Sequence, residues 1–119
     1  MREILLALPS IFLIGFANAI LKFRISYLNQ NGIYILSNQF VKFIFDPYIA
    51  AGAIATLFSI LWYLSIISQV RISVLYPLIQ SGAILFSFVL GIILFNENLN
   101  YSQFFGIIFI ILGITFIAK

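Results

Sequence analysis

The sequence predicts an all-α integral membrane protein with four transmembrane helices. Two observations predict this class: 64% of the 119 residues are hydrophobic while 8% are charged, and the mean hydropathy is +1.20. A soluble domain of this size exposes too much surface to hide so many apolar side chains. The apolar residues fall in four runs, at about 4–21, 48–69, 72–95 and 103–118, within one transmembrane domain over 1–119. These runs are close to the ~20 residues that a helix needs to cross a bilayer.

Charge and residue content exclude several function classes. The six basic and three acidic residues give a formal net charge of +3, and they are too scattered to indicate nucleic-acid binding. The sequence has no cysteine and no histidine, which removes disulfides, thiol catalysis and His–metal sites. No nucleophile–base pair is visible, so we expect no enzyme activity, no metal and no cofactor. The basic excess fits contact with lipid headgroups.

The first run, 4–21, follows Arg2 and is closed by Lys22 and Arg24. A signal peptide also begins with a basic residue and an apolar run. This run is long and no A-x-A-like cleavage site follows it, so we expect a retained transmembrane helix. Pro9 lies near its start, where early helix amides lack partners and a proline costs little.

The long connection 22–47 is expected to contain a turn, an interfacial helix and a helix start. Asn and Gly at 29–32 predict the turn, because both tolerate positive φ. Residues 33–45 are apolar but carry Asn38, Gln39 and Lys42; the segment is too short to span and fits a short amphipathic helix lying in the interface. Asp46 followed by Pro47 predicts an N-cap and a proline at the first helical position.

The second run, 48–69, carries a stripe of small and polar residues. The stripe recurs at helical spacing on one face, at Gly52, Thr56, Ser59 and Tyr63. Trp62 and Tyr63 lie near the middle of this run rather than at an end, where interfacial aromatics normally collect. A central aromatic most often packs between helices, and it can also be a platform for an amphipathic ligand.

The third run, 72–95, carries a second stripe of this kind. Its members fall at steps of four, three, four and four: Tyr76, Gln80, Ala83, Ser87 and Gly91. One interpretation is that small residues let helices approach while Gln80 hydrogen-bonds a neighbour; the other is that the stripe lines a transport path. The residues leave both open. Asn18 of the first run has the same two interpretations, and a structural hydrogen bond is favoured. Pro77 predicts a bend.

The fourth run, 103–118, follows a polar turn at 96–102 and is the most uniformly apolar. Gly106 and Gly113 are seven residues apart on one face, which forms a groove for another helix. Four spans put both ends of the chain on one side of the membrane. Three Lys or Arg residues then fall on each side, so the positive-inside rule returns a tie. The tie indicates that the chain can insert in both orientations.

The final half, from VRISVLYPLIQSGAI through LGIILFNENLNYSQFFGIIFIILGITFIA, resembles small multidrug resistance proteins and EamA-type members of the drug/metabolite transporter superfamily. The matched features are Ser73 with Tyr76-Pro77, the acidic turn Asn96-Glu97-Asn98-Leu99, Gly106 with Gly113, and an LKF at 21–23. The resemblance implies a dimer, commonly antiparallel, with the two glycines at its fourth-helix contact. It also implies that the first three helices of each protomer enclose the substrate chamber.

One departure from this family changes the expected function. Aligned on LKF, the family's membrane-embedded glutamate falls at Ile14, and no acidic residue lies deep in any predicted span. A proton-coupled cation exporter needs a titratable group in its path, so that activity is disfavoured. The pattern is more similar to the short four-helix flippase-like branch that handles undecaprenyl-phosphate-linked aminosugar, which also lacks that glutamate.

We therefore expect a multi-pass protein of the cell inner (plasma) membrane that moves an amphipathic substrate, a lipid-linked sugar above all, by alternating access. Its partners would be the bilayer, this substrate and a second copy or a paralogous subunit. The predicted path residues are Asn18, Ser59, Tyr63, Tyr76, Gln80 and Ser87. One alternative is an exporter of hydrophobic cations or small metabolites that uses aromatic faces. Another is a non-transporting assembly subunit of a membrane glycosyltransferase system.

The three acids are expected at span boundaries or in turns. Glu3 and Asp46 flank spans and Glu97 lies in the turn after the third span. We expect all three to be hydrated and ionised, with pKa values near the reference of ~4. Glu97, which matches an acidic position of the superfamily, could cap the N-terminal dipole of the fourth helix.

Overall fold

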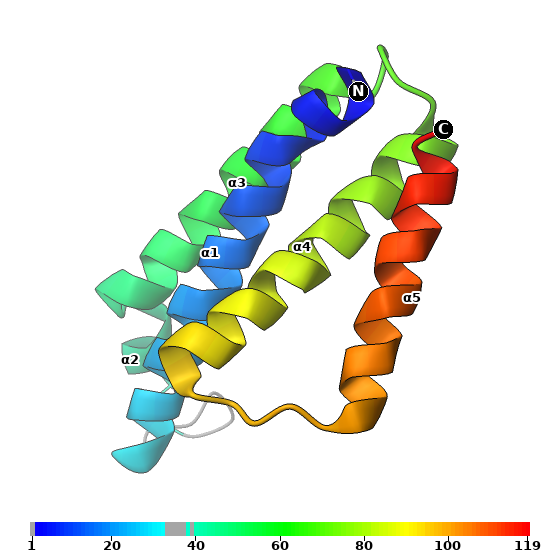
Figure 1. Ribbon diagram of the computed structural model, residues 1–119. Helices are drawn as coiled ribbons and strands as arrows, with labels where there is room; N and C mark the ends of the chain where they lie inside the picture. The colour runs from blue at the N-terminus through cyan, green and yellow to red at the C-terminus, as the bar shows by residue number, and fades with distance from the viewer. Residues whose placement is uncertain (1, 33–37, 39) are drawn as a thin grey trace.

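The computed structural model describes residues 2–32, 38 and 40–119 and contains no strand among them. Its helices are α1 (Arg2–Gln30), α2 (Phe40–Ile44), α3 (Pro47–Ile66), α4 (Ile72–Phe95) and α5 (Tyr101–Ile117), shown in Figure 1. Among these residues, α1, α3 and α4 are long and apolar enough to cross a membrane, and α5 is a shorter apolar helix of 17 residues. The prediction of a helical membrane protein is confirmed at this level.

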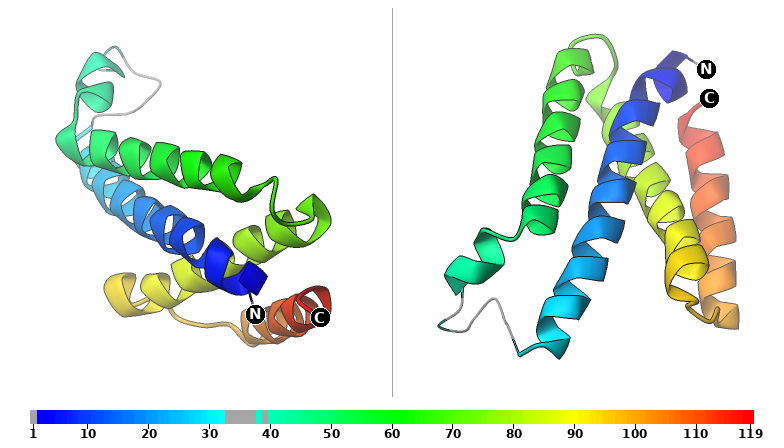
Figure 2. Two further views of the ribbon diagram at one scale, coloured as in Figure 1. Left: turned by 90° about the horizontal axis from the view of Figure 1, so that it is seen from above. Right: turned by 90° about the vertical axis from the view of Figure 1, so that its left-hand side faces the viewer.

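Helix α1 is the centre of the arrangement. It packs against α3 on one side and α4 on the other, while α5 lies against α4, as Figure 2 shows. The core gathers residues of α1, α3 and α4: Ala7, Ile11, Ile66, Leu75, Leu78 and Ile79. The two ends of the chain lie at the same end of the molecule (Figure 1). This agrees with the expected alternation of up and down helices.

Close approach of the helices depends on glycines that receive a side chain from the neighbouring helix. A Cβ at Gly52 of α3 would lie 2.7 Å from Leu21 Cγ of α1, and a Cβ at Gly82 of α4 would lie 2.5 Å from Ile11 Cδ1. Small residues at helix interfaces let backbones come together and gain van der Waals contact. Gly52 therefore permits the close approach of α1 and α3.

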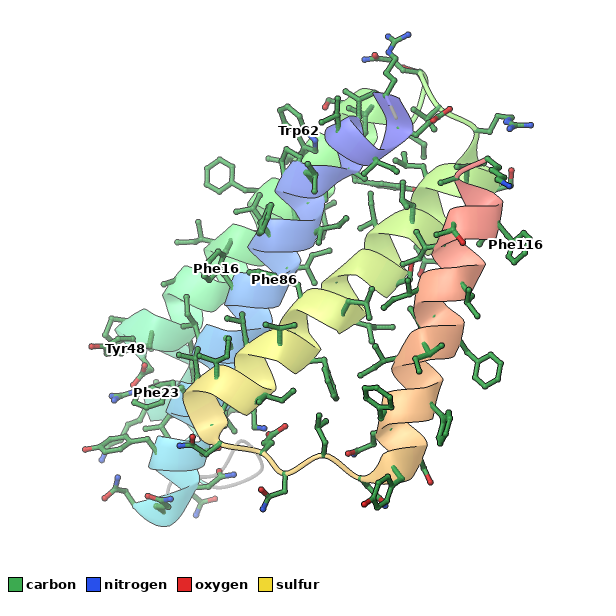
Figure 3. All side chains as sticks on the ribbon, viewed as in Figure 1. Phe16, Phe23, Tyr48, Trp62, Phe86 and Phe116 are labelled. Atoms are coloured by element: carbon green, nitrogen blue, oxygen red, sulfur yellow. The ribbon has the colours of Figure 1, made fainter. Side chains whose placement is uncertain are left out.

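Gly15 of α1 receives the ring of Phe86 from α4 in the same way. A Cβ at Gly15 would lie 2.8 Å from Phe86 Cε1 and nearer still to Cδ1. The ring is also held edge-on by Phe12 and Phe16 of α1, with centroid separations of 5.0 and 5.2 Å, and Figure 3 shows Phe16 beside Phe86. Such edge contacts add to the stabilisation from burial. Phe86 thus fixes how α4 crosses α1.

The predicted boundaries hold for α4 and need correction elsewhere. The first span was expected to end at residue 21, but α1 continues to Gln30, because Lys22 and Arg24 can extend their heads to the interface without ending a helix. At about 1.5 Å per residue, α1 is about 43 Å long. Pro9 is its eighth residue, so its missing N–H removes a bond that a mid-helix amide would make, contrary to the expectation.

The connection before α3 confirms the predicted N-cap and places the turn later than expected. Asn29 and Gln30 still belong to α1, and the turn lies at 31–32, where Gly32 adopts a φ of +75°. Asp46 is the N-cap of α3, with its carboxylate accepting from the Tyr48 N–H at 3.0 Å and Pro47 at the start of the helix. Of the predicted interfacial helix 33–45, the described part is the five-residue helix α2, and residues 33–37 and 39 lie outside the described residues.

The predicted run had placed Trp62 near the middle of its helix, but the structure places it near the helix end. Helix α3 ends at Ile66, so Trp62 is about one turn from that end. Its indole Nε1–H donates to the Leu6 carbonyl of α1 at 2.9 Å. This is the usual position of an interfacial tryptophan, with the ring in the apolar region and the N–H bonded at the rim.

The link between α4 and α5 corrects the role expected for Glu97. Asn96 ends α4 in the left-handed conformation, with φ 50° and ψ 40°. Helix α5 is capped by Asn100, which forms a reciprocal capping box with Gln103. The expected cap at Glu97 is therefore wrong, because a residue nearer the helix start satisfies its N–H groups. Glu97 instead pairs with Lys22 of α1.

Candidate functional site

Two adjoining clefts lie between the long helices. The α1–α4 cleft has a volume of about 420 Å³ and is lined by α1, α4 and Glu97. The α3–α4 cleft has a volume of about 310 Å³ and is lined by α3, α4 and Ile14 of α1. Ile14 and Gln80 line both clefts. We call the two clefts together the groove, with Ile14 and Gln80 at the junction.

All six predicted path residues line this groove. The α1–α4 cleft includes Asn18, Gln80 and Ser87, and the α3–α4 cleft includes Ser59, Tyr63, Tyr76 and Gln80. Residues that are far apart in the sequence are therefore brought together by the packing of α1 and α3 against α4. Their lining position is shown by the geometry, while their contact with a substrate remains a prediction.

The polar stripe of α4 faces the groove. Asn18 Nδ2 donates to Ser87 Oγ at 3.2 Å, across the α1–α4 cleft. The Gln80 side chain is exposed, and no hydrogen bond of its amide is found within the described part of the chain. Tyr76 is 54% exposed. This face of α4 can thus donate and accept hydrogen bonds to a molecule in the groove.

The polar stripe of α3 is used mainly for packing. Ser59 and Ser10 are buried opposite one another, and each hydroxyl donates to the carbonyl of the other residue at 3.4 Å. Thr56 donates to the Gly52 carbonyl of its own helix at 2.9 Å. The hydroxyls of Thr56 and Ser59 are thus satisfied inside the protein, as buried polar groups normally are, while Tyr63 lines the α3–α4 cleft. The two stripes, which look alike in sequence, therefore differ in their surroundings.

Lys22 and Glu97 form an ion pair that lines one end of the α1–α4 cleft. Lys22 Nζ also lies 4.6 Å from the centroid of the Phe95 ring, within cation–π range. Both charged side chains are about half exposed. Lys22 was not among the predicted path residues. The available signal was its helical spacing, because Lys22 follows Asn18 and Ile14 at steps of four on one face of α1.

The junction of the groove is uncharged. Ile14 and Gln80, which line both clefts there, are apolar and neutral. Among the lining residues described, the charged side chains are those of Lys22 and Glu97, at the end of the α1–α4 cleft. The middle of the groove therefore offers hydrogen bonds and apolar contact rather than a charge.

A second ion pair, between Arg24 and Asp46, lies beside the start of α3. Arg24 Nε donates to Asp46 Oδ2 at 2.8 Å, and its guanidinium lies 4.8 and 5.0 Å from the Tyr27 and Tyr48 rings. The bond from Arg24 lowers the pKa of Asp46 below its usual value of 3.8, against the effect of burial and with help from backbone N–H groups. Because its pKa is lowered, Asp46 is ionised as expected. It is only 7% exposed, so it is buried and not hydrated, contrary to the expectation.

The fourth-helix glycines are open in a single chain. A Cβ at Gly106 or Gly113 would meet no atom within 4 Å, and none of the 17 residues of α5, all of them described, is buried. Phe116 is 75% exposed and points away from the other helices in Figure 3. The role of these glycines in a dimer stays a prediction.

No protein-family model matches the chain, and neither a curated protein nor a solved structure does.

Proposed function

We propose that this chain is a transporter or flippase that moves an amphipathic, lipid-linked sugar across the plasma membrane. The observation that supports this most is the different use of the two polar stripes. The Thr56 and Ser59 hydroxyls of the α3 stripe are bonded inside the protein, whereas Gln80 and Tyr76 of α4 are exposed in a groove. A helix that only needed to pack would satisfy these groups, because unsatisfied polar groups are costly in the membrane.

The composition of the groove suits an amphipathic molecule. Side chains that can hydrogen-bond a sugar lie along α4 and at Asn18, while the flanks are apolar, with Ile84, Phe88 and Leu90 in the α1–α4 cleft. Sugar hydroxyls would bind the amides and the tyrosine hydroxyls. The lipid tail would remain outside, against the apolar flanks and the bilayer.

The same geometry supports movement without a proton-carrying carboxylate in the membrane. Ile14 and Gln80 stand at the junction, and neither changes its charge with pH. Transport by alternating access would then depend on substrate binding to two arrangements of the helices rather than on titration. The resemblance to the four-helix flippase-like branch agrees with this proposal.

Helix α5 is proposed as the fourth span and the dimer contact. Its 17 residues reach about 25 Å, at the short end of the range for a spanning helix. Its glycines present an open face, which a second copy in antiparallel orientation or a paralogous subunit would cover.

The test is transbilayer movement of a fluorescent short-chain polyprenyl-phosphate sugar in proteoliposomes. Gln80→Ala and Tyr76→Ala should abolish movement while the proteins still fold and dimerise. Val89→Ala is the matched control, because Val89 belongs to α4 and is 48% exposed but lines neither cleft. Equal movement in all three variants would refute the proposed path. Strong acceleration by a pH gradient that is lost in Glu97→Gln would instead show a proton-driven exporter.

A further inference from the structure

The Lys22–Glu97 pair indicates how the groove recognises its substrate, an inference that rests on the proposed function. Both residues line the α1–α4 cleft and pair with one another at its end. A charged pair that is half exposed contributes little to stability. Stability therefore does not account for the pair, and its place in the groove suggests a role in binding.

The two partners differ in how firmly they are held. Lys22 belongs to the long helix α1 and lies against the Phe95 ring as well as Glu97. Glu97 belongs to the link 96–100, whose residues lie outside the helices. Its backbone is tied to the end of α4 by one long hydrogen bond, from its N–H to the Gly91 carbonyl at 3.4 Å. The carboxylate is the partner that can leave.

Gly91 provides the space in which the Glu97 carboxylate rests. A Cβ at Gly91 would lie 2.8 Å from Glu97 Oε2, so even a methyl group there would push the carboxylate. When Glu97 leaves, a cation remains in the cleft, and Asn18 stands one turn before it on the same face of α1. An ammonium and an amide N–H together are donors suited to an anionic oxygen.

We propose that Lys22 binds the anionic headgroup of the substrate, a phosphate on an apolar tail, and that Glu97 is its built-in competitor. In the empty protein the Glu97 carboxylate neutralises Lys22. A phosphate that enters the cleft replaces the carboxylate on Lys22 and releases the link between α4 and α5. The apolar flanks of the cleft receive the first part of the tail.

The test is binding of hexyl phosphate to the full chain in micelles of an uncharged detergent, followed by the backbone amide NMR shifts of α1 around Lys22. Glu97→Gln should tighten binding by about 1.4- to 5-fold, as expected for removal of one exposed ion pair. Lys22→Gln should weaken it about tenfold or more. Lys42→Gln, the control lysine of α2, should bind as the parent does. A gain in Glu97→Gln cannot arise from misfolding.

The inference would be overturned by unchanged or weaker binding in Glu97→Gln, by unchanged binding in Lys22→Gln, or by binding of hexyltrimethylammonium in place of hexyl phosphate. Inorganic phosphate should bind more weakly than hexyl phosphate, because it has no tail, and equal binding would contradict a lipid headgroup as the ligand. This experiment requires no transport. Failure of binding with intact movement refutes the headgroup site alone, and binding without movement refutes the proposed function alone.

Discussion

Replacing Gly15 with alanine tests how α1 and α4 are held together. The added methyl group would overlap the ring of Phe86, and this ring cannot easily turn aside because it is packed against the rings of Phe12 and Phe16. Overpacking of this kind costs about 1–3 kcal/mol. Alanine also gains up to about 1 kcal/mol over glycine in a helix, so the single variant would show only part of the cost.

Gly106→Ala is the matched control, because the same exchange in α5 meets open space. Both variants share the gain in helix propensity, so Gly15→Ala should be less stable than Gly106→Ala by the full overpacking cost of about 1–3 kcal/mol. The measurement is unfolding in mixed micelles with a rising fraction of sodium dodecyl sulfate, followed by circular dichroism, at a dilution that keeps the chain monomeric. Phe86→Leu should recover part of the loss in Gly15→Ala. Equal stability of the two alanine variants would refute the proposed wedge.

Three further predictions concern other contacts. Because the pKa of Asp46 is lowered in the folded protein, its stabilising contribution should be fully present above its unfolded pKa of ~3.9 and be lost as the pH falls through the lower folded pKa. Asp46→Asn keeps an N-cap residue but loses the Arg24 pair, so the variant should be less stable at pH 7 and its stability should depend less on acid pH. An unchanged acid profile would contradict the ion pair. Gly106→Leu and Gly113→Leu should lower the yield of crosslinked dimer in membranes, since leucine fills the space for close approach, and an unchanged yield in both would remove α5 from the interface. Gly91→Ala should displace the Glu97 carboxylate and raise affinity for hexyl phosphate in the direction of Glu97→Gln; a lower affinity would argue against Gly91 as its resting place.

Sequence patterns predicted the features that depend on neighbours along the chain. The bounds of α4 and the N-cap at Asp46 followed from a local apolar run and a local capping signal. The end of α1 did not, because a run of apolar residues marks the membrane and not the helix, and Lys22 and Arg24 are compatible with both. Trp62 was misplaced for the same reason, since the helix ends before the apolar run does.

The candidate site divides in the same way. Helical spacing was enough to select the groove face of α4, from Tyr76 to Ser87. It could not distinguish this stripe from that of α3, because the difference is the partner of Ser59, which is Ser10 on another helix, 49 residues away. The Lys22–Glu97 pair joins residues that no local spacing relates. Its recognition required the crossing of α1 and α4.

In the proposed function, the α4 stripe faces a path that water and substrate enter. Because the sequence has no cysteine, single cysteines can be read without background. Cysteine at Gln80 and at Ser87 should react with a membrane-impermeant maleimide in proteoliposomes and be protected by the lipid-linked sugar. Cysteine at Val89, exposed on α4 but outside both clefts, should stay unreactive. Gln80 and Ser87 positions as unreactive as Val89 would show that the groove is filled by lipid or a partner helix, and would contradict a substrate path along α4.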